Sequence, residues 1–562
     1  MKTVMRLALA VALAAGALAV PNAGAKVPPD QENKRKGTVD VQLLALNDFH
    51  GNLEPPAGSS GRIGTVNAGG AEFLATHIRQ LEATNPNNTL VVSAGDLIGA
   101  SPLLSALFHD EPTIEAMNEI GLDLNAVGNH EFDEGADELL RMQYGGCHPT
   151  DGCQDGDDFA GADFRFLAAN VVYKATGKPI FSPYRIHTFD TGAKVAFIGM
   201  TLENTPEIVT PSGIAHLEFL DEADTVNNLI PEIKKKGAEA IVVLLHEGGV
   251  GGGGINECPN VSGPIVDIAN RMDDEVDAIV SGHTHQAYNC MIDGKVVTSA
   301  SSFGRLVTDI DMTIDRASGE ITQIAANNVI ASRDVDRFAP ITALIERYRE
   351  LAAPLANRVI GTITTDITRT NNAAGESALG DVIADAQHFA TAPANLGGAL
   401  MAFMNPGGIR ADLVYAPSKS EAPGEVTYEE AFTVQPFGNS LVTMTLTGAQ
   451  IETLLEQQWQ SATTTRILQV SNGFTYTWDA ARSIGDKVDP SSIKLHGVTI
   501  DPATSYRVTV NSFLADGGDG FSVLKEGSNR LGGDVDLDAL EKYMQATSPV
   551  APGPRNRITR VN

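Results

Sequence analysis

The sequence predicts an α/β protein with two large domains. Its 562 residues are too many for one hydrophobic core, and 43% hydrophobic with 20% charged residues is typical of a globular chain. In the first half, short apolar runs rich in Val, Ile and Leu are bounded by glycine, which is the pattern of buried parallel strands. The second half carries a different set of motifs, so we expect a second domain there.

Each of five apolar runs stops at a residue that can bind a metal ion. They are Val41–Leu46 before Asp48 and His50, Thr89–Ala94 before Asp96, Leu124–Val127 before Asn129, Ala240–Leu245 before His246, and Asp277–Ser281 before His283 and His285. In an open α/β sheet, ligands gather outside the carboxyl ends of the strands, so these side chains should share one edge. Oxygen and nitrogen donors without cysteine suit Zn, Mn, Fe or Co and exclude a thiolate zinc site.

The segment Gly128–Asp133 holds two further candidates beside the ligand Asn129. The imidazole of His130 can lie beside a phosphate oxygen, and Asp133, about one helical turn later, can orient that ring and stabilise its charge. The segment therefore indicates a metal-assisted phosphate site.

Residues 1–25 have the form of a secretory signal. Lys2 and Arg6 are the charged start, Leu7–Val20 is the apolar core, and Ala23-Gly24-Ala25 is a small-residue cleavage site. No later stretch is long and apolar enough to span a bilayer, and the C-terminus carries no anchor pattern. We expect an exported protein, periplasmic or secreted, without a stable membrane anchor.

The four cysteines suggest two disulfides in an exported chain. Three pairings are possible, and proximity in sequence favours Cys147 with Cys153 and Cys258 with Cys290. The formal net charge of −30 argues against binding to a nucleic-acid polymer. It does not argue against a small phosphorylated substrate, because cations at the site, and not the net charge of the chain, would determine how such a substrate binds.

Periodicity predicts the elements between these motifs. We expect helices over Ala71–Ala83, Thr113–Ile120 and Leu229–Lys236, and strands at Phe166–Asn170 and Val195–Gly199. Phe338–Asn357 reads as one helix interrupted by Pro354. Its position between two sets of motifs favours an interdomain connector, although the pattern alone fits a helix in one domain's core equally well.

The second half carries features of a ligand-binding domain. Glu376–Asp381 opens a helix, and the strand Ala399–Met404 leads into a glycine-containing segment that ends at Arg410. Glycine allows the backbone to approach a ligand closely, and an arginine can bind phosphate or carboxylate through two nitrogens. Phe437 and Phe513 each lie among polar and glycine residues. Two such rings could hold a flat base between them, although each could also be an ordinary loop-packing side chain.

The motifs of the first half resemble those of the calcineurin-like metallophosphoesterases, and the whole mature chain resembles the bacterial secreted 5′-nucleotidase family. The resemblance implies a four-layer β-sandwich flanked by helices over residues 38–335, a connector helix over 336–357, and an α/β substrate-binding domain over 358–562. It also implies two divalent ions (Zn, Mn or Co), with Asp96 bridging them. Asp48, His50 and His285 would complete one ion's ligands, and Asn129, His246 and His283 the other's.

The same resemblance implies a reaction. A hydroxide on the metal ions would attack phosphorus, and His130 with Asp133 would stabilise the developing charge, releasing phosphate from a nucleoside 5′-monophosphate. In the second domain, the substrate-binding roles would fall on Asn405, Gly408, Arg410, Phe437, Phe513 and Asp519. Many family members have an arginine where this chain has Gly375. We expect Arg369 to serve in its place through an altered loop.

Several alternatives stay open. Within the same chemistry the substrate could be a UDP-sugar, a 2′,3′-cyclic nucleotide or NAD. A related sulfur-oxidation enzyme shares much of the fold, but the two phenylalanines argue against it. The chain could also be an exported nucleotide- or metal-binding protein without turnover, which the presence of His130 and Asp133 disfavours. We expect a monomer whose partner is a small nucleotide.

Overall fold

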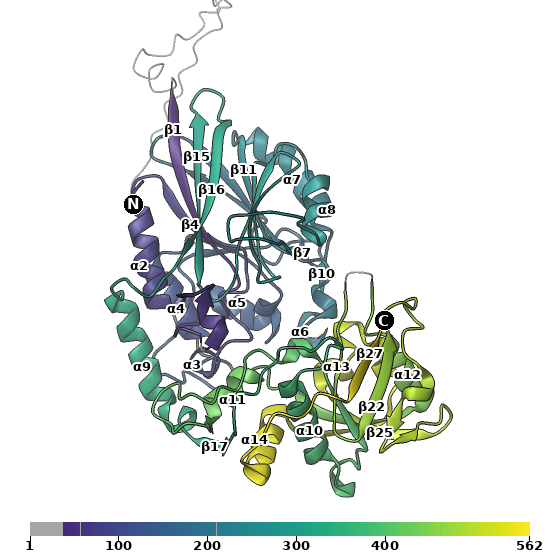
Figure 1. The fold of residues 1–562 in the computed structure, drawn as a ribbon. Coiled ribbons are helices and arrows are strands. Elements are labelled where there is room, and N and C mark those ends of the chain that lie inside the picture. Colours follow the sequence, from purple (N-terminus) through teal and green to yellow (C-terminus); the bar gives the residue numbers. More distant parts are fainter. Residues whose placement is uncertain (1–36, 57, 210, 462–463) are drawn as a thin grey trace, which may run out of the picture.

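The computed structural model describes residues 37–56, 58–209, 211–461 and 464–562 of the chain. The signal expected at residues 1–25 lies outside the described residues. Figure 1 shows two bodies, the first half of the chain in purple to teal above and the second half in green to yellow below. Helix α9 (Ala339–Ala356) lies along the side of the upper body and leads towards the lower one.

The first sheet of the upper body contains three of the predicted ligand-bearing strands. Its order is β16 (Ile321–Ile330), β15 (Leu306–Asp315), β1 (Thr38–Leu46), β4 (Thr89–Ser93), β5 (Leu124–Ala126) and β6 (Arg165–Leu167). The strands β1, β4, β5 and β6 are parallel to one another. Beside β1, β15 pairs antiparallel with β1, and β16 pairs antiparallel with β15. The parallel order brings the carboxyl ends of β1, β4 and β5 to one edge.

The second sheet contains the other two ligand-bearing strands, β11 and β12. Its order is β13 (Ala287–Ile292), β14 (Lys295–Ala300), β12 (Ala278–Ser281), β11 (Ala240–His246), β9 (Lys194–Thr201) and β8 (Tyr184–Thr188). The four inner strands are parallel, and the two outer strands are antiparallel to their neighbours.

The two sheets pack face to face, and their strands are apolar on both faces. In β11, Val242 and Leu244 belong to the core between the sheets, together with Leu43 of β1 and Phe197 of β9. The alternate residues of β11, such as Val243, pack against the helices outside. Because both faces are buried, the strands read as continuous apolar runs instead of alternating ones.

Helices cover both outer faces of the sandwich. The first sheet is covered by α2 (Ala71–Glu82), α4 (Glu111–Ile120), α5 (Ala136–Tyr144) and α9, and the second by α7 (Glu222–Lys235) and α8 (Pro264–Arg271). Short elements complete the domain: α3 (Leu103–Ala106), α6 (Pro211–Ile214), and the pairs β2 (Arg62–Ile63) with β3 (Val66–Asn67) and β7 (Val171–Tyr173) with β10 (Leu217–Phe219). The predicted four-layer sandwich is confirmed.

Two predicted helix boundaries differ from the structure. Helix α7 begins at Glu222, seven residues before the expected Leu229, with the Asp221 carboxylate accepting from the backbone N–H of Asp224. The first two turns are largely polar, so their apolar period is weak. Helix α9 continues past Pro354 to Ala356. Its Ile341, Ile345 and Tyr348 pack into the core of the first domain, so the connector also belongs to that core.

The second domain is an α/β body with two sheets. One has the order β21 (Gln469–Val470), β18 (Met401–Met404), β25 (Ser505–Asn511), β20 (Ser440–Thr447), β26 (Ser528–Val535), and the other β24 (Val498–Thr499), β23 (Lys494–Leu495), β22 (Phe474–Asp479), β27 (Ile558–Val561). The strand pair β17 (Val359–Thr362) and β19 (Glu425–Thr427) follows the connector. The helices are α10 (Ala378–Thr391), α11 (Tyr428–Val434), α12 (Gly448–Glu456), α13 (Ser512–Ala515) and α14 (Asp536–Thr547).

Both favoured cysteine pairings are present as disulfides, Cys147 with Cys153 and Cys258 with Cys290. Among the residues that the structure describes, no helix combines the length and apolar character needed to cross a bilayer.

Shortening a side chain in the layer between the sheets should destabilise the whole domain. Leu244 is fully buried there, so Leu244→Ala should lower the free energy of unfolding by about 2–5 kcal/mol. Leu351→Ala is the control, because Leu351 on α9 is 43% exposed, and its effect should stay within about 0.5 kcal/mol. Urea unfolding followed by circular dichroism measures both. Equal losses in the two variants would contradict the packing described.

Candidate active site

The carboxyl ends of five strands meet at one edge of the sandwich, as the sequence predicts. They bring together all seven predicted metal ligands: Asp48, His50, Asp96, Asn129, His246, His283 and His285. Their possible ligand atoms gather in close clusters. Two of these clusters share no side chain, one containing Asp48 and the other containing Asp96.

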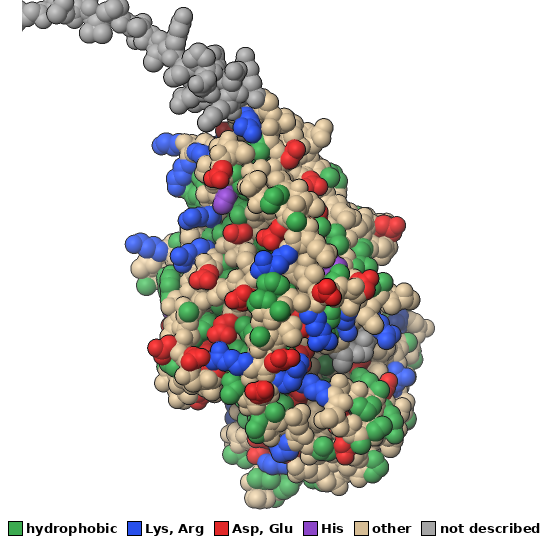
Figure 2. All heavy atoms as spheres, turned by 90° about the vertical axis from the view of Figure 1, so that its left-hand side faces the viewer, with side chains coloured by type: hydrophobic (Ala, Val, Ile, Leu, Met, Phe, Trp, Pro, Cys, Tyr) green, Lys and Arg blue, Asp and Glu red, His purple; other side chains and the backbone are tan. Residues whose placement is uncertain are grey.

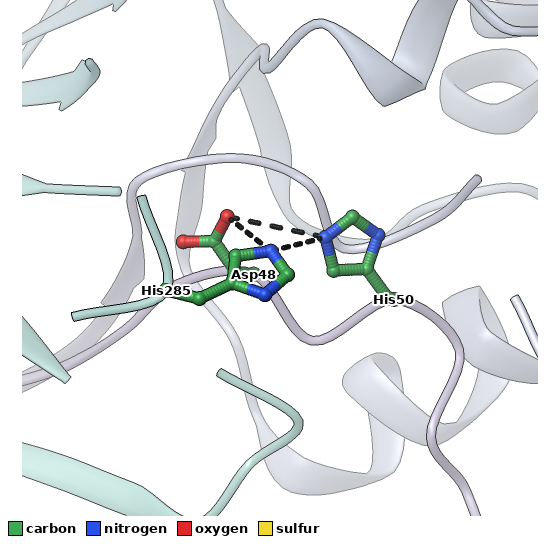
Figure 3. A group of neighbouring side chains, drawn as sticks. All are labelled: Asp48, His50 and His285. Carbon is green, nitrogen blue, oxygen red and sulfur yellow. Dashed lines mark hydrogen bonds and ion pairs between the residues drawn. The ribbon is translucent and has the colours of Figure 1, made fainter. Parts of the chain in front are cut away.

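The first cluster consists of Asp48, His50 and His285, whose ring nitrogens and carboxylate point towards one another (Figure 3). The Nε2 atom of His285 lies 3.3 Å from Asp48 Oδ1 and 3.1 Å from His50 Nε2. The Nε2 atom of His50 also lies 3.6 Å from Asp96 Oδ2. Asp96 therefore borders this cluster as well as its own.

The second cluster consists of Asp96, His246 and His283, with Asn129 beside them. The Nε2 atom of His246 lies 2.9 Å from Asp96 Oδ2, and Asn129 Oδ1 lies 3.0 Å from His283 Nδ1. Burial by itself would raise the pKa of Asp96, but His246 and His130 lower it well below its usual value. Asp96 is thus the carboxylate shared by the two clusters.

The donor set fits divalent cations. The Nδ1 atom of His246 lies 2.7 Å from the Ala94 carbonyl oxygen and that of His50 lies 2.9 Å from the Gly99 carbonyl oxygen. A carbonyl can only accept, so each Nδ1 carries a proton, and the neutral form of each ring presents a lone pair at Nε2. The Nε2 atom of His246 lies 2.9 Å from Asp96 Oδ2. Burial lowers the pKa of His246, but Asp96 raises it to about 10. The pair therefore favours a positive charge between these two atoms, which a proton or a divalent cation can supply.

Five of the predicted ligands have a backbone conformation that residues other than glycine rarely adopt. The φ angles are 49° at Asp48, 48° at His50, 51° at Asp96, 68° at His283 and 55° at His285. Such left-handed turns are costly for residues other than glycine, and they cluster at functional sites. Each turn directs a ligand back over the end of its strand, where an extended residue would point to one side of the sheet.

Glu131 is a site residue that the sequence did not single out. Its carboxylate is 2% exposed and accepts hydrogen bonds from the backbone N–H groups of Asp96, Leu97 and Gly128, at 2.9, 2.9 and 2.7 Å. Burial is the main cause that raises its pKa to about 7. Glu131 therefore joins the turn that carries Asp96 to the turn that carries Asn129. Its neighbours in sequence do not reveal this role, because its partners on the Asp96 turn lie more than thirty residues earlier.

His130 and Asp133 lie beside both clusters. The Nδ1 atom of His130 lies 2.8 Å from Asp133 Oδ2, and its backbone N–H donates to Asp96 Oδ1 at 2.8 Å. Burial lowers the pKa of His130, but Asp133 and Asp96 outweigh it, so the net shift is upward. The imidazole is held in one orientation, next to the predicted metal centre and with Nε2 free to face a substrate.

A cavity of about 260 Å³ joins this edge to the second domain. Asn129, His130, Asp133 and His283 line it from the first domain. From the second domain it is lined by six of the seven predicted substrate residues: Asn405, Gly408, Arg410, Phe437, Phe513 and Asp519. The ring of Phe437 stacks on that of His130, with centroids 5.7 Å apart and planes 20° apart. The two domains therefore form one site.

Arg369 is the predicted substrate residue that does not line this cavity in the described part of the chain. Its guanidinium donates to the Ile409 carbonyl oxygen at 3.3 Å and is partly exposed. Its charge is close enough to Arg410 to help lower the pKa of that residue, after burial. Arg369 thus lies behind Arg410 and supports the segment that carries it.

Arg466 is a second residue that the sequence did not single out. It lines the cavity and its Nε lies 3.2 Å from Asp519 Oδ1. The other carboxylate oxygen of Asp519 accepts from the Asn405 side chain at 2.9 Å. Arg466 follows three threonines and has no local motif. Only its long-range partner Asp519 reveals it.

Comparisons with known proteins agree with this architecture. Residues 41–287 match the calcineurin-like phosphoesterase family, and residues 359–526 match the 5′-nucleotidase C-terminal domain. A crystal structure of a 5′-nucleotidase precursor from Thermus thermophilus is similar over 93% of this chain and 100% of that one, with a TM-score of 0.75 and 27% identity.

Two curated relatives are each 33% identical to this chain. Endonuclease YhcR of Bacillus subtilis aligns over 92% of this chain and 41% of its own length, so this chain spans about two fifths of that relative. Cell wall protein Lmo0130 of Listeria monocytogenes aligns over 90% of this chain and 67% of its own length.

Changing Glu131 to Gln should weaken metal binding, because the amide would place an NH₂ group against backbone N–H donors. We expect the affinity for divalent ions to fall by about 10- to 100-fold, as when contacts behind metal ligands are lost. Metal content at fixed free Mn²⁺ or Zn²⁺ measures this. The control is Glu119→Gln on the exposed face of α4. A Glu131 variant that binds metal as the parent protein does would contradict the role described.

Proposed function

We propose that this chain, which belongs to the 5′-nucleotidase family of calcineurin-like phosphoesterases, releases phosphate from nucleoside 5′-monophosphates. Family membership makes it a metal-dependent hydrolase of phosphoric esters. The observation that carries the finer proposal is the cavity between the domains. One wall holds His130 and two of the predicted metal ligands, Asn129 and His283, and the other holds two phenylalanines and two arginines.

We propose that the site binds two divalent ions. Asp48, His50, His285 and Asp96 would hold one, and Asp96, Asn129, His246 and His283 the other, which follows the two clusters of ligand atoms. When bound, such ions supply an activated water and polarise the phosphoryl group. Zn, Mn and Co all suit this donor set.

His130 would act on the charge that develops in the reaction. The Oδ2 atom of Asp133 accepts from Nδ1 of His130, and the two atoms are 2.8 Å apart. This bond fixes the ring beside the predicted metal centre. The ring can then donate from Nε2 to a phosphoryl oxygen or to the leaving oxygen of the nucleoside. The upward shift of the His130 pKa favours the protonated ring that such donation needs.

The second domain would select the substrate. Among the described residues, Arg410 forms no ion pair within 4.0 Å: its guanidinium lies 3.5 Å from the Gly407 carbonyl oxygen and over the Phe437 ring. Burial lowers its pKa, and Asp96, Asp133 and Asp48 act against this from further away. A guanidinium without a direct carboxylate partner at the cavity suits the phosphate group. Phe437 and Phe513 would stack on the base, and Asp519 with Asn405 would accept from and donate to the ribose hydroxyls.

We also propose that the protein is exported and acts as a monomer on small nucleotides. The two disulfides fit an oxidising compartment. On the face shown in Figure 2, acidic and basic side chains are interspersed, so this face has no extended basic surface for a nucleic-acid polymer.

Removing the imidazole should separate catalysis from metal binding. In His130→Ala, we expect kcat for AMP to fall by about 10²- to 10⁴-fold, with metal content unchanged. Asp133→Asn should show a smaller loss of the same kind. Steady-state phosphate release and elemental analysis of the same preparations measure the two quantities. Loss of bound metal in His130→Ala would contradict the proposed role, because it would make His130 a ligand.

The aromatic pair should determine preference for nucleotides. Phe437→Ala and Phe513→Ala should each lower kcat/KM for AMP by about 5- to 150-fold, which corresponds to about 1–3 kcal/mol of base stacking. Hydrolysis of bis-p-nitrophenyl phosphate, which has no base, should change little. Phe389→Ala is the matched control, since Phe389 on α10 is 45% exposed.

The same assay, with Mn²⁺, Co²⁺ or Zn²⁺ supplied, tests the proposed substrate against its alternatives. AMP should be hydrolysed faster than UDP-glucose, NAD, 2′,3′-cyclic AMP or a single-stranded oligonucleotide. Faster cleavage of the oligonucleotide would favour an endonuclease, the activity named for one relative. Binding of AMP without phosphate release would indicate a binding protein.

A further inference from the structure

We propose that a second metal site, separate from the predicted catalytic centre, lies at His109, His148 and Asp151. Its ligand would be one borderline-soft divalent cation of the Zn²⁺ class, held by two imidazoles and a carboxylate. These three side chains present ligand atoms that all lie within 4.8 Å of one another.

The three side chains come from two parts of the fold. His109 lies at the corner between α3 and α4, and His148 and Asp151 lie in the loop closed by the Cys147–Cys153 disulfide. The His109 Nε2 atom is 2.9 Å from Asp151 Oδ2, and His148 Nδ1 is 3.4 Å from the same oxygen. Neighbouring ligands of a tetrahedral zinc ion are about 3.3–3.5 Å apart, given bonds of about 2.0–2.1 Å. The 3.4 Å spacing falls within this range, and the 2.9 Å spacing is that of a hydrogen bond, which a bound ion would replace.

His109 already has the support that metal-binding histidines have. Its Nδ1 lies 2.8 Å from Glu134 Oε2, so a carboxylate behind the ring fixes its orientation and leaves Nε2 to face Asp151. His109 also has a φ angle of 51°, the same left-handed conformation as five ligands of the catalytic centre. This conformation is uncommon for residues other than glycine, although histidine adopts it more readily than most.

His148 must move for an ion to bind, and in this structure its Nδ1 accepts from the Asp151 backbone N–H at 3.2 Å. The rings of His109 and His148 are stacked, with centroids 3.7 Å apart and planes 14° apart. A metal lies in the plane of each imidazole that binds it, so one ion cannot satisfy both stacked rings. His148 must turn about its side-chain bonds, while Glu134 keeps His109 in place. His148 and Asp151 are 15% and 44% exposed, so the site is open to solvent ions.

The site would connect the rim of the cavity to the connector helix. Glu134 and Asp110, the residue after His109, both line the cavity. The Asp110 carboxylate accepts from the Gly99 N–H at 3.0 Å, and the Gly99 carbonyl oxygen accepts from Nδ1 of His50. On the other side, Asp155, two residues after Cys153, accepts from Tyr348 and Arg347 of α9 at 3.0 and 2.7 Å. A bound ion would therefore fix the Cys147–Cys153 loop between the rim of the cavity and helix α9.

Counting zinc ions per chain tests the proposal. The full chain is equilibrated with buffered free Zn²⁺ and analysed for bound metal. We expect His148→Ala and Asp151→Asn each to bind one ion fewer than the parent protein. His216→Ala, which removes an exposed histidine stacked on Tyr173, should bind the same number as the parent.

Hydrogen exchange gives a second readout that does not depend on the count. Zn²⁺ should slow exchange in residues 147–158 of the parent protein and leave it unchanged in His148→Ala. Equal zinc counts in the parent, His148→Ala and Asp151→Asn would overturn the proposal. So would an equal loss in His216→Ala, because it would show unspecific surface binding. Because the result is a difference between variants, it does not depend on how many ions the catalytic centre holds or on its activity.

Discussion

The active edge depends on one constraint: five strands must end together and turn sharply enough to direct their next residues over the sheet edge. The left-handed turns at Asp48, Asp96 and His283 are energetically costly. The surrounding structure holds them in place. Glu131 accepts from three backbone N–H groups and fixes the Asp96 turn to the next one, and Asp48 accepts from the backbone of His283. Asp48, which would bind metal, thus also holds the backbone that presents another predicted ligand, and Glu131 holds two turns without being a ligand itself.

Asp96 is where these constraints meet. Its carboxylate lies between His50 and His246, and it accepts from the backbone N–H of His130. One group therefore connects both clusters to the imidazole proposed for catalysis. The stack of Phe437 on His130 extends this connection to the second domain. In the proposed function, substrate selection and chemistry are therefore divided between the two domains, which meet at the His130–Phe437 contact.

The sequence predicted what depends on local order and missed what depends on distant contacts. The seven predicted ligands come shortly after the ends of strands, so a short window around His246 or His283 is enough to mark such residues as candidates. Glu131 and Arg466 bond to partners that are far away in sequence, so no local pattern marks them. The start of α7 was missed for a related reason, because its first turns are polar and are defined by the Asp221 cap and by packing.

Gly128 has a consequence for how this protein tolerates mutation. A Cβ at this position would lie 2.2 Å from Asp96 Oδ1 and 2.6 Å from the Asp96 backbone nitrogen. Any side chain there must displace the carboxylate on which both clusters depend. In a library that samples every substitution, Gly128 should be as intolerant as the ligands themselves, although it offers no side chain to metal or substrate. The set of residues that mutation cannot change without loss of the site therefore includes Gly128, whose role is to leave room for the Asp96 carboxylate.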